Sequence, residues 1–127
     1  MFATYDYSAF PIVKILLKGS IFDDNDFSNF TNQWINLYDN KKDFEFIIYI
    51  EKLEYIEIKY CLYTAIFLKS MKKKPIQYLK KSKIYTSSNY IYYLLNIIFN
   101  IEKPVAPVEL IFTDKNNNNK ISKFFTN

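Results

Sequence analysis

The sequence FEFIIYI at residues 44–50 decides the fold. Every position except Glu45 is apolar or aromatic, and a short run of this kind predicts a strand covered on both faces of a sheet. Strands buried in this way belong mainly to parallel sheets, whose strands are joined by crossover helices. On each side of residues 44–50 the sequence has the pattern of a helix.

The helix expected before this strand runs from the acidic residues at positions 23–26 to about Asn40. Asp23, Asp24 and Asp26 occupy its first turn, where the helix dipole favours negative charge. Its apolar face has helical spacing and is formed by Phe27, Phe30, Trp34 and Leu37.

The segment at residues 58–74 predicts the helix that follows the strand. A single apolar stripe with steps of three and four residues is expected to face the core, formed by Ile58, Cys61, Leu62, Ala65 and Leu68. Lysines gather at the end of this segment, before Pro75, where positive charge suits the helix dipole.

Further strands and one more helix lie outward from this centre. Strands are predicted at residues 2–7, 12–17, 83–86 and 108–112. Ser87-Ser88-Asn89 forms the N-cap of a third helix, whose inward side chains are expected to be Ile91, Leu94, Leu95 and Ile98. The resulting order is β-β-α-β-α-β-α-β. We therefore expect an α/β fold with a four- to five-stranded mixed sheet and crossover helices.

The length of the chain favours a single core, and one domain is expected at residues 1–115. We interpret the Asn-rich stretch after it as a linker, and residues 120–127 as a loose terminal helix or a flexible tail. The longest uncharged stretch, residues 85–101, is shorter than the roughly 20 apolar residues that a membrane span needs, so we expect no span. Cys61 is the only cysteine, and the first residues lack the pattern of a signal peptide, which favours a cytoplasmic protein.

The composition excludes several kinds of site. All 17 basic residues are lysine, and the chain has neither His nor Arg. The absence of these residues excludes Ser-His-Asp and Cys-His catalysis, His-ligated metal sites and arginine-finger phosphoryl transfer. The abundance of Lys, Asn, Ile, Tyr and Phe is typical of an A+T-rich genome, such as those of some parasites and large viruses, so aromatic content alone is no signal of binding.

Three further groups of residues give no prediction of a metal, catalytic or docking site. Asp23, Asp24 and Asp26 lack the ligand spacing of an EF-hand loop, and we expect no metal. No pattern places two of the glutamates at positions 45, 51, 54 and 57 on one face of a pocket, so no catalytic residue and no cofactor is assigned. The motif Pro104-Val105-Ala106-Pro107 matches a loose docking pattern, but we interpret it as the entry to the strand at 108–112.

The sequence Leu17-Lys18-Gly19-Ser20-Ile21, followed by Asp23, resembles the turn after the second strand of STAS domains, the module of anti-sigma factor antagonists and sulphate transporter tails. Phe46–Ile50 is similar to the third strand of that family, and Leu53–Glu57 to the approach to its second helix. Ser88, Ile91, Leu94 and Leu95 resemble the opening of a later family helix. This resemblance spans residues 12–112 and implies a STAS-like fold.

The resemblance also implies a non-catalytic module that binds a protein partner at the start of the second helix and the neighbouring first helix. The residues that it assigns to partner binding are Tyr55, Glu57, Ile58, Lys59, Tyr60, Asp23 and Asp24. In the family, a Ser or Thr at this helix terminus accepts phosphate, and the modification controls binding. Ile58 and Lys59 stand there in this chain and have no hydroxyl, so we expect the phosphorylation switch to be absent.

Two alternative functions remain open at this point. A basic cluster would suit nucleic acid or an acidic phospholipid surface and consists of Lys69, Lys72, Lys73, Lys74, Lys80, Lys81 and Lys83. A self-assembling structural protein is the other alternative, because three tyrosines at positions 90, 92 and 93 cannot all point inward from one helix. Exposed tyrosines favour an interface with a protein partner or with a second copy of the chain.

Overall fold

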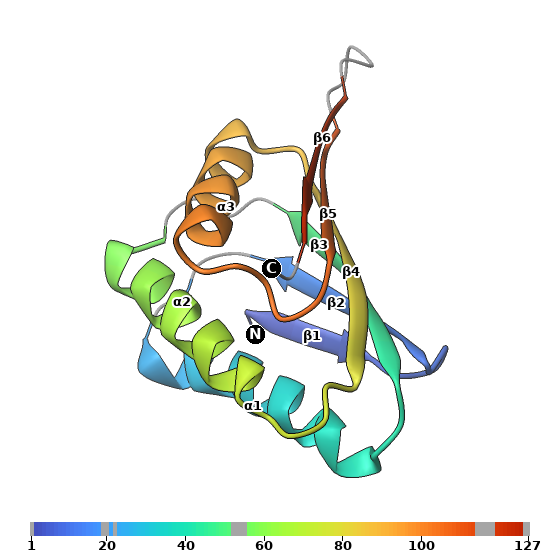
Figure 1. Ribbon diagram of the computed structural model, residues 1–127. Coiled ribbons are helices and arrows are strands. Elements are labelled where there is room, and N and C mark those ends of the chain that lie inside the picture. Colours follow the sequence, from blue (N-terminus) through green and yellow to red (C-terminus); the bar gives the residue numbers. More distant parts are fainter. Residues whose placement is uncertain (1, 19–20, 22, 52–55, 114–118, 126–127) are drawn as a thin grey trace.

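The computed structural model describes residues 2–18, 21, 23–51, 56–113 and 119–125. Within these residues the chain forms six strands and three helices, and the helices connect the four strands from β2 to β5 (Figure 1). Their bounds are β1 (Ala3–Asp6), β2 (Ile12–Lys18), α1 (Asp24–Leu37) with a 3-10 turn (Tyr38–Asn40), β3 (Phe44–Glu51), α2 (Ile58–Lys72), β4 (Leu79–Thr86), α3 (Asn89–Ile101), β5 (Val108–Phe112) and β6 (Lys120–Phe124).

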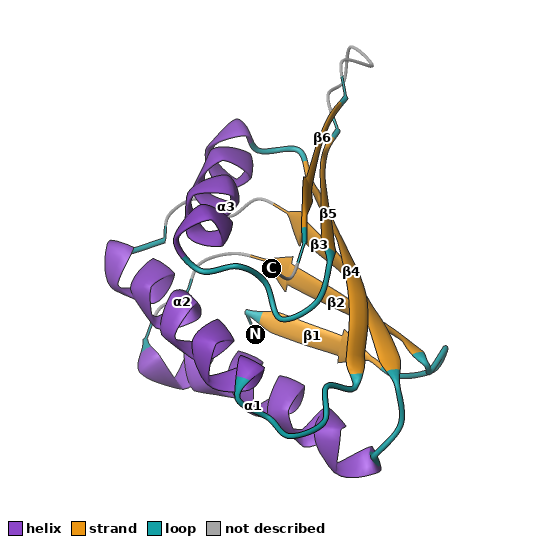
Figure 2. Ribbon diagram, in the orientation of Figure 1, coloured by secondary structure: helices purple, strands orange, loops and turns teal. Residues whose placement is uncertain are grey.

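The strands form one mixed sheet in the order β1-β2-β3-β4-β5-β6. The inner strands β2 to β5 are parallel to one another, whereas β1 and β6 pair antiparallel at the two edges. The three helices lie on one face of this sheet (Figure 2). The α/β class and the mixed sheet were predicted correctly, but the sheet has six strands rather than four or five.

The core lies between the sheet and the helix layer. Along β2, the side chains of Val13, Ile15 and Leu17 are buried beneath the helices, and the alternate positions Lys14 and Lys18 are exposed on the other face. The same alternation continues along β3, where Tyr49 and Glu51 are exposed. The prediction that residues 44–50 are covered on both faces is therefore wrong, because no helix among the described residues lies on the second face of the sheet.

Two of the helices begin at side-chain caps, and the sequence predicts the cap of α3. Asp23 accepts a hydrogen bond from the amide of Asp26 at the start of α1, and Ser88 accepts one from the amide of Ile91 at the start of α3. These caps satisfy amide groups that have no partner inside the helix. They define where α1 and α3 begin, shortly after the carboxyl ends of β2 and β4, respectively.

The buried face of α2 differs from the predicted stripe. Tyr60, Leu68 and Met71 are buried, whereas Ile58 and Leu62 project into solvent. The sequence of α2 is apolar around most of its circumference, so spacing alone fits two faces. Packing against α1 selects the face: the ring of Tyr60 lies 5.7 Å from Phe27, and the ring of Phe67 lies 5.0 Å from Trp34.

The end of the chain also differs from the prediction. Residues 120–124, expected as a helix or a tail, form the edge strand β6. Two contacts attach this strand to α3: the hydroxyls of Tyr92 and Ser122 lie 2.5 Å apart, and the rings of Phe99 and Phe124 lie 5.1 Å apart. The alternation of Lys120, Ser122 and Phe124 toward the helix layer is the pattern of a half-buried strand.

The contact between β6 and α3 gives a direct test of this part of the fold. Phe124→Ala removes a half-buried ring that packs on Phe99, so we expect the free energy of unfolding to fall by about 1–2 kcal/mol in urea titrations. The matched control is Phe125→Ala, because the neighbouring ring is 67% exposed and its loss is expected to change little. Equal effects of the two variants would contradict the placement of β6.

A second test uses Tyr38, whose hydroxyl donates a hydrogen bond to Gln77. Burial raises the pKa of Tyr38 to about 12 from 10.0. The unfolded chain therefore releases this proton at lower pH than the folded chain, and stability falls as the pH rises above about 10. At pH 11 we expect Tyr38 to account for up to about 1 kcal/mol of this loss after screening. Tyr38→Phe should have a flatter dependence of its urea midpoint between pH 9 and 11, and parallel curves would contradict this origin.

Candidate functional site

The starts of α1 and α2 lie together, as the partner-binding interpretation requires. The hydroxyl of Tyr60 donates a hydrogen bond of 3.0 Å to a carboxylate oxygen of Asp24. The ammonium of Lys59 lies 3.8 Å from Asp24 and 3.8 Å from Glu57. The structure thus brings four of the predicted site residues into one network, and Asp23 adjoins it as the cap of α1. Tyr55 lies outside the described residues.

The phenol of Tyr60 and the amine of Lys59 are held in their ordinary protonation states. Burial and the hydrogen bond to Asp24 raise the pKa of the Tyr60 phenol. The Tyr60 phenol and the Asp24 carboxylate raise the pKa of Lys59. At neutral pH the phenol is therefore neutral and the amine is charged, so neither of these two groups serves as a general base or nucleophile. Its effect is to join α1 to α2, and the ring of Tyr60, only 2% exposed, is not available to a partner.

A larger feature lies on the outer side of the helix layer. Seven large apolar side chains project there into solvent, each more than half exposed. We call this set the α2–α3 apolar surface, and its members are Ile58, Leu62 and Ile66 of α2 with Tyr90, Tyr93, Ile97 and Ile101 of α3. Ile58, which the resemblance to STAS domains assigned to partner binding, belongs to it.

The spacing of these residues places them in one stripe on each helix. Positions 58, 62 and 66 are four residues apart, and positions 90, 93, 97 and 101 follow steps of three and four. The two helices pack against each other and lie side by side in the helix layer (Figure 1). Near their carboxyl ends, Lys72 of α2 forms an ion pair of 3.0 Å with Glu102, which directly follows α3. The two stripes therefore run along neighbouring helices.

The chemistry of this surface is that of an interface. From residue 89 to residue 101 the chain has no charged residue, so asparagine provides most of the polar character of α3. Large exposed apolar patches are uncommon on proteins that act as free monomers and mark surfaces that another molecule covers. Covering a half-exposed Ile or Leu side chain contributes about 1 kcal/mol, so a partner that covers several gains a useful part of its affinity here.

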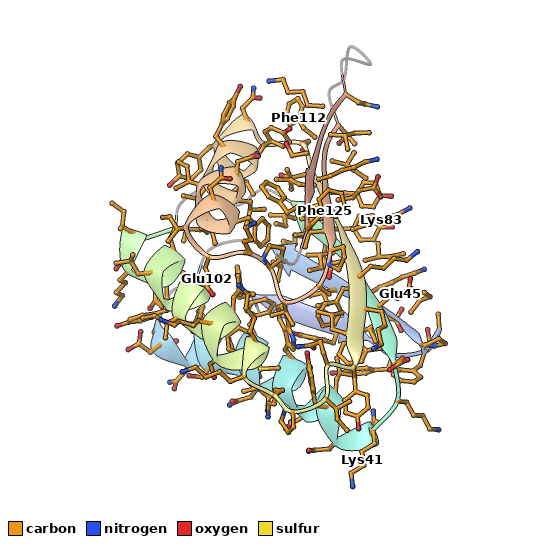
Figure 3. The ribbon with its side chains drawn as sticks, in the orientation of Figure 1. Lys41, Glu45, Lys83, Glu102, Phe112 and Phe125 are labelled. Atoms are coloured by element: carbon orange, nitrogen blue, oxygen red, sulfur yellow. The ribbon has the colours of Figure 1, made fainter. Side chains whose placement is uncertain are left out.

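The open face of the sheet is a weaker candidate. The strand register aligns five apolar or aromatic side chains across it, in the order Leu16, Tyr49, Tyr85, Ile111 and Ile121. The rings of Tyr49 and Tyr85 stack 5.4 Å apart. Charged residues flank this row: Glu45 and Lys83 project from this side of the sheet (Figure 3). Most of the row is half-buried by its neighbours, so it exposes less apolar area than the helix layer does.

The predicted basic cluster is divided by the fold. Its first four lysines lie at the end of α2, whereas the last three lie on β4. Three members form ion pairs: Lys72 with Glu102 at 3.0 Å, Lys80 with Asp43 at 3.6 Å, and Lys81 with Glu45 at 3.7 Å. These carboxylates offset part of the positive potential on which phosphate binding depends.

Other features of the chain add no site. Among the described residues, no group of three or more metal-ligating side chains comes together. Burial raises the pKa of the Cys61 thiol, which lowers the fraction of the reactive thiolate. Pro104, Val105 and Ala106 are buried, so the proline motif does not present a docking segment. No described helix is both long and apolar enough to cross a bilayer.

Comparison with protein-family models, with curated proteins and with solved structures found no significant match to this chain.

Sequence reasoning found only part of the α2–α3 apolar surface. It predicted exposed tyrosines on the third helix, and Tyr90 and Tyr93 are exposed. It missed Ile66, Ile97 and Ile101, and it placed Ile58 and Leu62 in the stripe that faces the core. A signal was present, because positions 90, 93, 97 and 101 form a second apolar stripe opposite the buried one.

The division of the lysines predicts weak binding of polyanions. We expect no measurable affinity for single-stranded DNA or for acidic phospholipid vesicles at physiological salt, because ion pairs offset part of the cluster and its members lie on two elements. Fluorescence anisotropy and vesicle sedimentation at low and physiological salt measure this. Binding that falls steeply with salt and weakens in a variant with Lys69→Ala and Lys73→Ala would contradict the prediction.

Proposed function

We propose that this chain is a non-catalytic protein-interaction module that binds a protein through the α2–α3 apolar surface. The observation that carries the proposal is the pair of exposed apolar stripes on neighbouring helices, with side chains 51% to 76% exposed. The outer face of a helix pair with this composition suits the apolar face of a helix or sheet from another protein. The partner is either a different protein or a second copy of the chain.

The resemblance to STAS domains supports the same function. That family binds partners near the start of its second helix, and the corresponding α2 contributes Ile58, the most exposed of the seven apolar residues. The general α/β class agrees with a STAS-like fold. Because no hydroxyl stands at positions 58 and 59, we propose that binding is constitutive and is not controlled by phosphate at this helix terminus.

The absence of catalysis is part of the proposal. With no His and no Arg in the chain, general-base chemistry near neutral pH would have to use a carboxylate or a lysine. The titratable network at the start of α2 keeps its phenol neutral and its amine charged, which suits a structural role.

The proposal is tested by placing a charge in the α2–α3 apolar surface. Leu62→Lys and Ile97→Lys should each weaken binding at least tenfold, because a charge at a dry interface loses its water without gaining a partner. The matched control is Ile121→Lys, since Ile121 has similar exposure, 57%, but lies on β6 and on the open face of the sheet. Each variant serves as bait for partners in cells of the source organism, and sedimentation velocity measures self-association.

The comparison between variants decides the result. A protein, or a second copy, that binds the wild type and the Ile121→Lys control but not the two helix variants supports the proposal. Binding that survives both helix variants and is lost in the control would move the interface to the open face of the sheet. Circular dichroism must show that all three variants fold.

A further inference from the structure

The middle helix of the layer stands away from the sheet. α1 closely approaches β1, and α3 closely approaches β4 and β5, whereas α2 makes no comparable approach to any described strand. Its bulky side chains pack sideways instead, with Tyr60 and Phe67 against Phe27 and Trp34 of α1. The backbone of α2 is thereby held at a distance that the side chains beneath it do not fill.

A cavity of about 120 Å³ occupies this space. Its wall is almost entirely carbon and includes Trp34, Ile48, Ile84 and Leu95, with Thr64 on the α2 side. Ile21 and Ile56, which are both partly exposed, also line it.

The size of the cavity limits what fits in it. An engineered cavity of about 150 Å³ with an apolar wall stays dry and binds benzene. Burying water among apolar groups costs free energy because the water loses hydrogen bonds. The cavity therefore suits an uncharged molecule of roughly the size of one aromatic ring.

Two polar groups in the wall have no hydrogen-bond partner within the described part of the chain, the indole N–H of Trp34 and the hydroxyl of Ser82. Ser82 is 6% exposed and lines the cavity, and its amide donates to the carbonyl of Pro107, but its hydroxyl makes no hydrogen bond. The other hydroxyls of the wall are engaged: Thr64 donates to the Tyr60 carbonyl, and Tyr60 donates to Asp24. A buried hydroxyl without a partner is costly, so it favours a ligand that carries one hydrogen-bonding group.

We propose that the cavity between α2 and the sheet is a binding site for a small, neutral, mainly apolar molecule, one aromatic ring in size, with a single hydroxyl that bonds to Ser82. Phenols are the chemical class that fits this description. The site is distinct from the α2–α3 apolar surface, since it lies on the inner side of α2.

Trp34 supplies a direct readout because it is the only tryptophan in the chain and lies in the wall of the cavity. Iodine quenches indole fluorescence on close contact. 4-Iodophenol is therefore expected to quench Trp34 saturably, while iodide ion, which is charged and excluded from an apolar cavity, leaves the emission almost unchanged. Ser82→Ala should raise the concentration of 4-iodophenol needed for half-quenching about tenfold and leave that of iodobenzene nearly unchanged.

Variants that fill the cavity complete the test. Thr64→Leu and Ala106→Leu each add carbon to the wall and should abolish saturable quenching. Thr4→Leu is the matched control, since Thr4 is exposed on β1, and it should bind as the wild type does. Two filling variants are used so that, where one of them fails to fold, the other still tests the site.

The outcomes separate clearly. Saturable quenching that is lost in a folded filling variant and retained in Thr4→Leu supports the site, whatever the results of the partner-binding experiments. Quenching that rises linearly without saturation, that iodide reproduces, or that persists in the folded filling variants would overturn it. Equal effects of Ser82→Ala on 4-iodophenol and iodobenzene would overturn the role of the hydroxyl.

Discussion

The handedness of three crossover connections is the constraint on which the rest of this structure depends. Connections between parallel strands of one sheet are right-handed in nearly all proteins. Here each successive strand, from β2 to β5, is added on the same side of the previous one. When crossover connections have the same handedness and add each strand on the same side of the previous one, their helices lie on the same face of the sheet. The helix layer is therefore one-sided, the opposite face of the sheet stays open, and α2 lies in the middle of the layer with a neighbour on each side.

The middle position gives α2 two unusual faces. On its inner side, its aromatic side chains pack on α1, and a cavity of the core lies between it and the sheet. On its outer side, Leu62 and Ile66 join the exposed apolar residues of α3. An ordinary surface helix separates an apolar stripe from a charged one, whereas α2 is apolar around most of its circumference. Both apolar faces of such a helix are shielded from water when the core lies beneath it and a partner covers its outer side.

The sequence was most informative where the physical signal is local. The cap at Ser88 and the acidic start of α1 depend on residue type and spacing alone, and the strand Val108–Phe112 was predicted at its observed bounds. The prediction that residues 44–50 are covered on both faces was wrong, because a strand with apolar residues on both faces has the same pattern whether one face or both are covered. The faces of α2 were not predictable for a similar reason, since only the packing of Tyr60 and Phe67 on α1 distinguishes them. In the candidate site, exposed tyrosines followed from geometry, but Ile97 and Ile101 were hidden by a composition that is rich in isoleucine throughout.

Residue-resolved hydroxyl-radical footprinting tests the central claim, that the apolar residues on the outside of the helix layer form an interface. In the monomeric chain, Leu62, Ile97 and Ile101 should react readily, while Val13, Ile15 and Leu110 in the core should be protected. On binding of the partner, the first group should become protected and exposed Ile121 on the open sheet face should keep its reactivity. Protection of Leu62, Ile97 and Ile101 in the monomer, or unchanged reactivity of these residues in the complex, would contradict the account.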